Sequence, residues 1–293
     1  MDAELLDSIT LDLGGGSEAA LAFILSLMMF AVALGLRTEH FRFFKDNPKI
    51  YLAGVLAQII GLPALTLLIC YIVNPPASVA LGMILIASCP GGNTSNLLAL
   101  FGRANTALSV SLTATSSLAA AFITPISIIF WSQLYPPTSA LLTEINLDKW
   151  SFLQNTLIIL ALPLLLGMLI ARFAPTLSAR LQKPLSALAG LGLIVIIIGA
   201  CLQYLPVFFQ LGLAIFALVI AHNGLAFLMG FLAGVITKAD TRSRRALTFE
   251  VGIQNSGLGI VILLTQLGGL GGCLLYTSPS PRDATLSRMP SSA

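Results

Sequence analysis

The chain has 293 residues, of which 57% are hydrophobic and only 9% are charged, and its formal net charge is +3. A soluble domain carries about 25% charged residues. The composition and a mean hydropathy of +0.94 therefore exclude an ordinary soluble enzyme or nucleic-acid-binding domain and predict a polytopic membrane protein.

Eight apolar segments reach the length of about 20 residues that a helix needs to cross a bilayer. In chain order they are residues 19–36, 49–72, 78–101, 104–132, 151–171, 184–204, 209–237 and 246–272. Residues 1–18 are acidic and lack the pattern of a cleavable signal peptide, so we expect an external N-terminal segment. With residues 133–149 as an external loop, the spans divide into two halves, 19–132 and 150–272.

Basic residues predict the orientation of these spans. Before residue 273, twelve of the thirteen Lys and Arg residues fall in alternate loops, and the exception is Lys149. By the positive-inside rule those loops are cytoplasmic and the N-terminus is outside, which predicts a multi-pass protein of the cell membrane.

The character of the chain changes after Gly272. Residues 273–293 are polar, are rich in Ser and Pro, and resemble a translated adapter or vector sequence. We interpret them as a non-native tail. On this interpretation the native protein continues past the eighth span, and at least one helix is missing.

Two polar interruptions lie inside apolar spans, CPGGNTSN at 89–96 and EVGIQNSG at 250–257. Lipid cannot satisfy exposed backbone groups, so a broken helix survives at this depth only where protein buries it or where it lines a cavity. Two such breaks in corresponding halves indicate the binding site of a transporter. The loop charges place the two broken spans antiparallel to each other.

Glu250 is the only acid well inside a predicted span. A charge at the bilayer centre costs about 2.5–3.5 kcal/mol on insertion scales. Because no Lys or Arg lies inside a span, a bound cation is the natural partner of Glu250. The alternative is that Glu250 extends toward Arg244 and Arg245 at the cytoplasmic end.

Oxygen-bearing side chains that suit a hard cation surround the breaks. Ser109 and Thr113 are four residues apart and share a helix face, so with Ser95, Asn96 and Glu250 they can enclose one ion. Gln58 is open between an ion ligand and a bond to a neighbouring helix. The remaining polar residues are assigned to helix packing or to bonds between helices: Ser111, Thr115, Ser116, Ser117, His222 and Asn223.

A half-helix begins near Asn93, and the partial positive charge at its N-terminus favours an anion. Transport of an organic anion together with cations would fit this arrangement. Cys89 at the first break gives a weak thiol argument for an arsenite carrier, and His222 leaves proton coupling open.

Four motifs together are specific: PGGNTSN at 90–96, RANTALSVSLT at 103–113, HNG at 222–224 and FEVGIQNSGLG at 249–259. From about residue 19 to 272 the chain resembles the bile acid:sodium symporter family, within the bile acid, arsenite and auxin carriers. The resemblance implies two sodium sites and a substrate contact. The first site is implied at Ser95, Asn96, Ser109, Thr113 and Glu250, the second at Gln58, Glu250, Val251, Ile253 and Gln254, and the substrate contact at Asn93 and Asn255.

The resemblance also implies the fold and the activity. It predicts an all-α inverted-repeat transporter in which two crossed broken helices lie in a core domain and a panel domain moves against it. The expected function is sodium-coupled import of an organic anion, either bile-acid-like or a small carboxylate or sulfonate, by alternating access. Na⁺ is the coupling ion, and neither a further cofactor, a nucleic-acid partner nor an enzymatic activity is expected. An arsenite-type or proton-coupled carrier on the same fold is the alternative, and the last core helix is expected to be missing.

Overall fold

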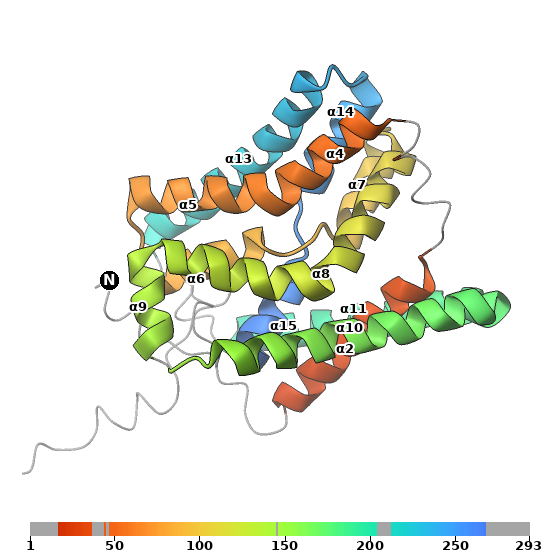
Figure 1. Ribbon diagram of the computed structural model, residues 1–293, viewed down its shortest axis with the longest axis horizontal. Helices are drawn as coiled ribbons and strands as arrows, with labels where there is room; N and C mark the ends of the chain where they lie inside the picture. The colour runs from red at the N-terminus through yellow and green to blue at the C-terminus, as the bar shows by residue number, and fades with distance from the viewer. Residues whose placement is uncertain (1–16, 37–43, 45–46, 145, 204–211, 268–293) are drawn as a thin grey trace, which may run out of the picture.

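The computed structural model describes residues 17–36, 44, 47–144, 146–203 and 212–267. Every regular element of these residues is helical (Figure 1). In chain order they are α2 (Ser17–Leu34), α4 (Pro48–Leu56), the π-helix η2 (Ala57–Gly61), α5 (Leu62–Val73), α6 (Ala77–Ala87), α7 (Asn93–Phe101), α8 (Thr106–Leu134), α9 (Pro136–Glu144), α10 (Lys149–Phe173), α11 (Pro175–Gln203), α13 (Gly212–Ile236), α14 (Thr241–Gly252) and α15 (Ser256–Gln266).

Within the described residues, four helices are long and apolar enough to cross a membrane. They are Pro48–Val73, Thr106–Leu134, Lys149–Phe173 and Ile215–Ile236. Three shorter apolar helices, at Ala19–Leu34, Ala77–Ala87 and Ser256–Gln266, accompany them. The described part of the chain is therefore all-helical, as in a polytopic membrane protein, whereas the count of eight spans stays a prediction.

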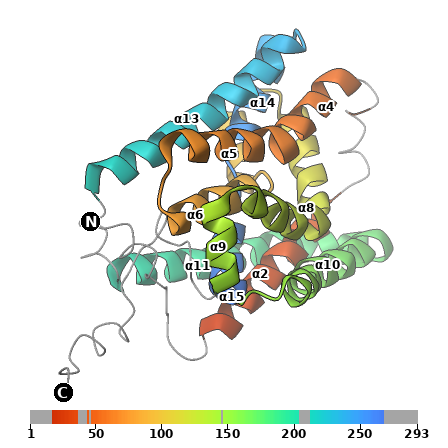
Figure 2. The same cartoon turned by 60° about the vertical axis from the view of Figure 1, so that its left-hand side comes forward.

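The helices form two layers (Figures 1 and 2). One layer consists of α2, α10 and α11, which contact one another. The second contains the remaining helices, with α13 running beside α4, η2 and α5 on the side away from the first layer. We call these the three-helix layer and the crossing layer. The largest buried cluster lies between them, where Leu258, Val261 and Leu263 of α15 meet Leu25 of α2 and Leu160 of α10.

Several helix ends differ from the sequence-based expectation, and prolines explain most of the differences. α11 begins at Pro175, nine residues before the predicted span, and α9 occupies part of the predicted external loop with Pro136 as its first residue. Proline fits the first helical turn, where its missing N–H has no partner anyway. α11 nevertheless continues through Pro184, where the predicted span began. The start of the predicted span 209–237 lies outside the described residues.

The second predicted span is not a uniform α-helix. At η2 the amide of Leu62 donates to the carbonyl of Ala57, five residues back. Pro63 has no N–H to offer to the carbonyl of Ile59, so the regular ladder is interrupted at this point. A π-turn of this kind often occurs at functional sites, and here it carries Gln58.

Both predicted interruptions are present, and they cross in the middle of the molecule (Figure 1). The peptide between α6 and α7 and the peptide between α14 and α15 form an antiparallel bridge at Gly91 and Gln254. The amide of Asn255 donates to the carbonyl of Pro90 at 2.8 Å. Each break thus satisfies backbone groups of the other, as burial away from water requires.

Candidate functional site

Glu250 lies at the crossing, in the last turn of α14, and is 0% exposed. Three hydroxyl groups reach its carboxylate. Ser95 of α7 donates to Oε1 at 2.7 Å, and Ser109 of α8 donates to the same oxygen at 2.5 Å. Thr113 of α8 lies 3.0 Å from Oε1 and 2.9 Å from Oε2. Residues more than 130 positions apart in the chain therefore meet at one carboxylate.

The same hydroxyls have competing acceptors. Ser109 and Thr113 also reach Oδ1 of Asn96, at 2.8 and 3.3 Å, and Ser95 reaches the carbonyl of Gly92 at 2.6 Å. Each hydroxyl carries one hydrogen. Three hydrogens thus serve four acceptor oxygens, so the cluster has more oxygen lone pairs than donors. We call Ser95, Asn96, Ser109, Thr113 and Glu250 the first oxygen set, and the structure brings all five together.

A second group of oxygens lies around the backbone carbonyls of Glu250 and Val251. Gln58 Nε2 donates to the carbonyl of Glu250 at 2.8 Å, and Gln254 Nε2 donates to the carbonyl of Val251 at 2.7 Å. In both glutamines the amide oxygen, Oε1, is buried and has no hydrogen-bond partner among the residues that the structure describes. A buried acceptor without a partner lowers the stability of the fold by about 1–3 kcal/mol, and a water molecule or an ion can satisfy it. With Ile253, these residues are the second oxygen set.

Gly91 allows the two sets to approach the crossing. A Cβ atom at this position would lie 2.5 Å from Gln58 Nε2 and 2.7 Å from Glu250 Oε2. Any side chain there would displace residues of both sets. Glycine is therefore needed at position 91 for close approach.

Within the described residues, no basic side chain pairs with Glu250. Arg244 donates to the carbonyl of Ala239 at 3.2 Å, and Arg245 donates to the carbonyl of Gly102 at 3.2 Å. The alternative that Glu250 extends toward these arginines is not observed, because its carboxylate hydrogen-bonds with the hydroxyl cluster instead.

Asn255 is the N-cap of α15, and its Oδ1 accepts from the amide of Leu258 at 3.1 Å. Capping is a structural role that the sequence analysis did not assign, although Asn before a helix start is its usual signal. Asn93 is the first residue of α7, but its side chain lies outside the described part of the chain. The structure therefore leaves the predicted substrate contact of these two residues open.

Asn105 is a further residue that sequence reasoning missed. Its Oδ1 caps α8 by accepting from the amide of Leu108 at 3.2 Å, and its Nδ2 donates to Ser243 of α14 at 3.0 Å. Its amide also donates to the carbonyl of Arg242 at 3.0 Å. Asn105 thus fixes the start of α8 against α14 and sets how Ser109 and Thr113 face Glu250.

The two polar residues in α13 have separate roles. His222 Nε2 and Thr66 Oγ1 of α5 are 2.8 Å apart, and Thr66 also donates to the carbonyl of Leu62. His222 therefore bonds the neighbouring helix, as predicted. Asn223 does not, since its Nδ2 donates to Val219 of the same helix at 2.9 Å.

Fold and site together define a class of protein: a helical membrane protein with a buried carboxylate where two broken helices cross. A sequence model of the Sodium Bile acid symporter family matches residues 22–208, which is more than half of the chain. The chain belongs to this family.

Individual relatives carry related names. The "Uncharacterized sodium-dependent transporter YocS" of Bacillus subtilis (strain 168) is 31% identical over 250 residues, covering 85% of this chain and 75% of the relative. "Probable sodium/metabolite cotransporter BASS1, chloroplastic" of Arabidopsis thaliana is 29% identical over 246 residues, covering 83% and 59%. The "Ileal sodium/bile acid cotransporter" of Homo sapiens is 26% identical over 245 residues, covering 82% and 68%. The chain thus spans about three fifths to three quarters of these relatives.

Proposed function

We propose that the protein is a sodium-coupled symporter that imports an organic anion by alternating access. Its relatives named as sodium-dependent transporters or sodium cotransporters support sodium as the coupling ion. The observation that carries the proposal is the fully buried Glu250 carboxylate, which has hydroxyl and amide oxygens around it and no basic partner among the described residues.

The first oxygen set binds one Na⁺. Sodium is a hard cation that prefers oxygen ligands. When it enters, the hydroxyls of Ser95, Ser109 and Thr113 turn their lone pairs toward the ion and direct their hydrogens to other acceptors. The ion also compensates the charge of Glu250, which is costly to bury without a partner.

The second oxygen set binds another Na⁺. The free Oε1 atoms of Gln58 and Gln254 and the backbone carbonyls of Val251 and Ile253 are its ligands. Both sets include Glu250, which couples the two ions. One carboxylate between two cations leaves the site with an excess positive charge, which favours an anionic substrate.

The substrate is an organic anion, either bile-acid-like or a small carboxylate or sulfonate, placed beside Asn93 and Asn255. These residues stand at the starts of α7 and α15, and helix N-termini attract negative charge. Import also uses the membrane potential. Each uncompensated positive charge that moves into the cell gains about 2.3 kcal/mol per 100 mV.

The division into two layers supports alternating access. In this proposal residues 19–132 and 150–272 are inverted repeats, and the three-helix layer is the panel against which the crossing layer moves. Each position of the panel opens the same central site to one side of the membrane.

The direct test is uptake into proteoliposomes together with thermal unfolding of the purified protein. We expect Na⁺ to raise the melting temperature and K⁺ to leave it unchanged, and organic anions to add stabilisation only when Na⁺ is present. An equal response to Na⁺ and K⁺ would refute sodium coupling. Uptake driven by a pH gradient in sodium-free buffer would favour the proton-coupled alternative.

A further inference from the structure

A face of α8 carries buried hydroxyls far beyond the first oxygen set. Ser109, Thr113, Ser116, Thr124 and Ser127 follow one another at spacings of three, four or eight residues, so they share one side of the helix. All five are buried, with exposed fractions of 7% or less. The first two contact Glu250, and the last three continue toward the Leu134 end of α8.

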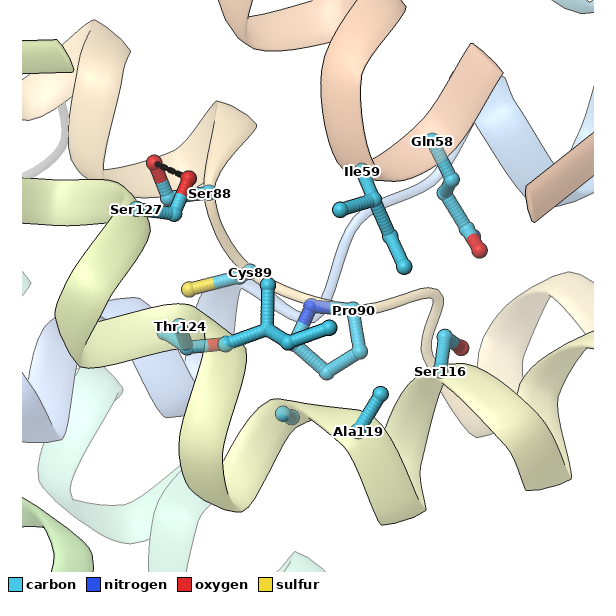
Figure 3. Close-up of a pocket in the computed structure, with 11 residues that line it drawn as sticks. Gln58, Ile59, Ser88, Cys89, Pro90, Ser116, Ala119, Thr124 and Ser127 are labelled. Carbon is cyan, nitrogen blue, oxygen red and sulfur yellow. Dashed lines mark hydrogen bonds between the residues drawn. The ribbon is translucent and has the colours of Figure 1, made fainter. Parts of the chain in front are cut away.

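These last three hydroxyls line a cavity between η2, the end of α6 and α8 (Figure 3). We call it the hydroxyl cavity and define it by Gln58, Ser88, Cys89, Ser116, Thr124 and Ser127. The centre of a water molecule can occupy about 20 Å³ of it. That is room for about one water molecule or one small ion, and it is too small for an organic anion.

Gln58 connects the hydroxyl cavity to the second oxygen set. Its side chain is 2% exposed, and its Nε2 is held by the carbonyl of Glu250 at 2.8 Å. Its Oε1 has no partner in the described part of the chain, and the residue lies on the cavity wall across from Ser116 (Figure 3). A residue whose buried acceptor has no partner among the described residues therefore lines a space the size of one ion.

The hydroxyl groups of Ser116 and Ser111, which lie on the same helix, differ in their hydrogen bonds. Ser111 donates to the carbonyl of Ala107 at 2.6 Å, a strong bond within its own helix. Ser116 has only a long contact of 3.3 Å to the carbonyl of Thr113. The Ser116 oxygen is thus freer to serve a guest in the cavity, although both residues are equally buried.

The electrostatics of the hydroxyl cavity favour a cation. No described residue that lines it carries a charge. The carboxylate of Glu250 lies near Gln58, because a Cβ at Gly91 would lie 2.5 Å from Gln58 Nε2 and 2.7 Å from Glu250 Oε2. A buried negative charge attracts a cation over such a distance because the surrounding dielectric is low.

We propose that the hydroxyl cavity is an antechamber in which Na⁺ is held by Ser116 and Gln58 before it enters the second oxygen set. This inference rests on the proposed function, and it adds a route that does not pass through the first set. The loop charges assign this half of α8 to the external side, so the antechamber serves loading from outside. Ser116, for which the sequence predicts a packing role, becomes a ligand of the ion in this proposal.

Cys89 in the cavity wall provides the test, because Ag⁺ is close to Na⁺ in size and reacts with a thiol to give an S–Ag bond and a released proton. The probe protein keeps Cys89 as its sole cysteine, with Cys70, Cys201 and Cys273 changed to Ala, and must retain the sodium-dependent melting shift. Ag⁺ is added to this protein, and the thiols that remain free are counted with a fluorescent maleimide after denaturation.

We expect Ag⁺ to modify Cys89 and to abolish the sodium-dependent melting shift. Na⁺ at ten times its dissociation constant should slow the modification about tenfold, whereas N-methylglucamine should not slow it. In the Cys89→Ala protein, Ag⁺ should leave the sodium-dependent melting shift unchanged. If Cys89 does not react, or reacts equally fast with and without Na⁺, the cavity is a closed or water-filled space and the antechamber is wrong.

A matched pair of variants gives a second measurement. Ser116→Ala should raise the Na⁺ concentration for half-maximal stabilisation about threefold to tenfold, and Ser111→Ala should leave it within about twofold. Equal effects in the two variants would overturn the role of Ser116. A parent protein that shows no sodium response at all would instead refute the proposed function, so the two failures are distinguishable.

Discussion

At the scale of the residue, the chemistry concentrates on one carboxylate. Glu250 is removed from water entirely, and its neighbours are three hydroxyls that can each donate only one hydrogen. Hydrogen bonds to the charged form offset part of the desolvation cost. A cation offsets more, because it also occupies the lone pairs that the hydroxyls cannot all direct at a donor.

The first prediction concerns Glu250→Gln, which removes the charge and keeps the shape. We expect the apparent Na⁺ affinity to fall more than about tenfold, a cost above about 1.4 kcal/mol. Without Na⁺ the variant should melt at the same temperature as the parent or higher, because an unpaired buried charge is gone. The measurement is a Na⁺ titration of the melting temperature, and Glu144→Gln on the exposed surface of α9 is the control. If the Na⁺ titration of Glu250→Gln is the same as that of the parent, neither oxygen set binds Na⁺.

A second prediction separates the two oxygen sets. Gln58→Met keeps the length of the side chain but removes the amide oxygen that lacks a partner. Since two linked cations give a Hill coefficient above one, we expect the coefficient of the Na⁺ titration to fall toward one in this variant. Thr66→Val, about two helical turns farther along the same span, should keep the coefficient of the parent. A coefficient that stays above one in Gln58→Met would argue against the second set.

At the scale of the element, the crossing of the two breaks holds both sets in place, and Gly91 lies at its centre. Gly91→Ala should weaken the sodium response about tenfold or more, because its Cβ would meet Gln58 and Glu250. Gly190→Ala in α11 is the matched control, since nothing lies within 4 Å of a Cβ at that position. That control should be neutral or slightly stabilising, because Ala favours a helix over Gly. Equal sodium titrations for the two variants would contradict the close approach.

The start of α14 predicts a pH dependence. A hydrogen bond with the Ser243 side chain, followed by backbone bonds from Ser243 and Arg242, holds the pKa of the Asp240 carboxyl below its ordinary value. A lowered pKa in the folded state means that this stabilisation is present above the ordinary pKa and is lost as the pH falls through the lowered one. Asp240→Ala should cost about 1 kcal/mol at neutral pH, as for other N-caps.

The measurement for Asp240 is the melting temperature between about pH 7 and pH 3, across the ordinary pKa of about 3.9. The difference between the parent and Asp240→Ala should shrink toward the acidic end. A difference that stays constant with pH would show that the ionised carboxylate is not what caps α14.

The elements also show what sequence reasoning can and cannot reach. The breaks were predictable because glycine and amide residues interrupt apolar runs, whereas the roles of the oxygen sets stay predictions that rest on the resemblance of their motifs to a known family. The π-turn at Gln58 was not, since it depends on how Pro63 shifts hydrogen bonds inside an otherwise helical segment. The hydroxyl cavity was not either, because the seven-residue spacing from Ser109 to Ser116 is equally typical of close helix packing.

At the scale of the whole molecule, composition predicted a helical membrane protein but not which helices form which layer. The contact of α11 with the start of α15 illustrates the difference. Leu193 of α11 lies against Gly257, so close that a Cβ at position 257 would overlap its side chain. This contact joins the three-helix layer to the crossing layer beside Asn255. No sequence pattern in α11 or at the start of α15 predicts it.

The last prediction uses this contact to test whether the layers move. In a protein without its native cysteines, Leu193→Cys with Gly257→Cys should form a cross-link under oxidation, because the shorter side chain at 193 leaves room for the new one. We expect the cross-link to reduce anion uptake more than about tenfold, since it fixes one of the two orientations that alternating access needs. Na⁺ should still raise the melting temperature, because neither residue belongs to an oxygen set.

The matched control joins Ile24→Cys and Gly192→Cys, which contact each other within the three-helix layer. With that cross-link in place, uptake should be close to the uptake of the reduced protein. Helices that move together are not constrained by a bond between them. Reduction of the first cross-link should restore uptake. If uptake persists while Leu193→Cys and Gly257→Cys are joined, the two layers do not move against each other at this contact, and the motion that exposes Glu250 to each side must take place within the crossing layer.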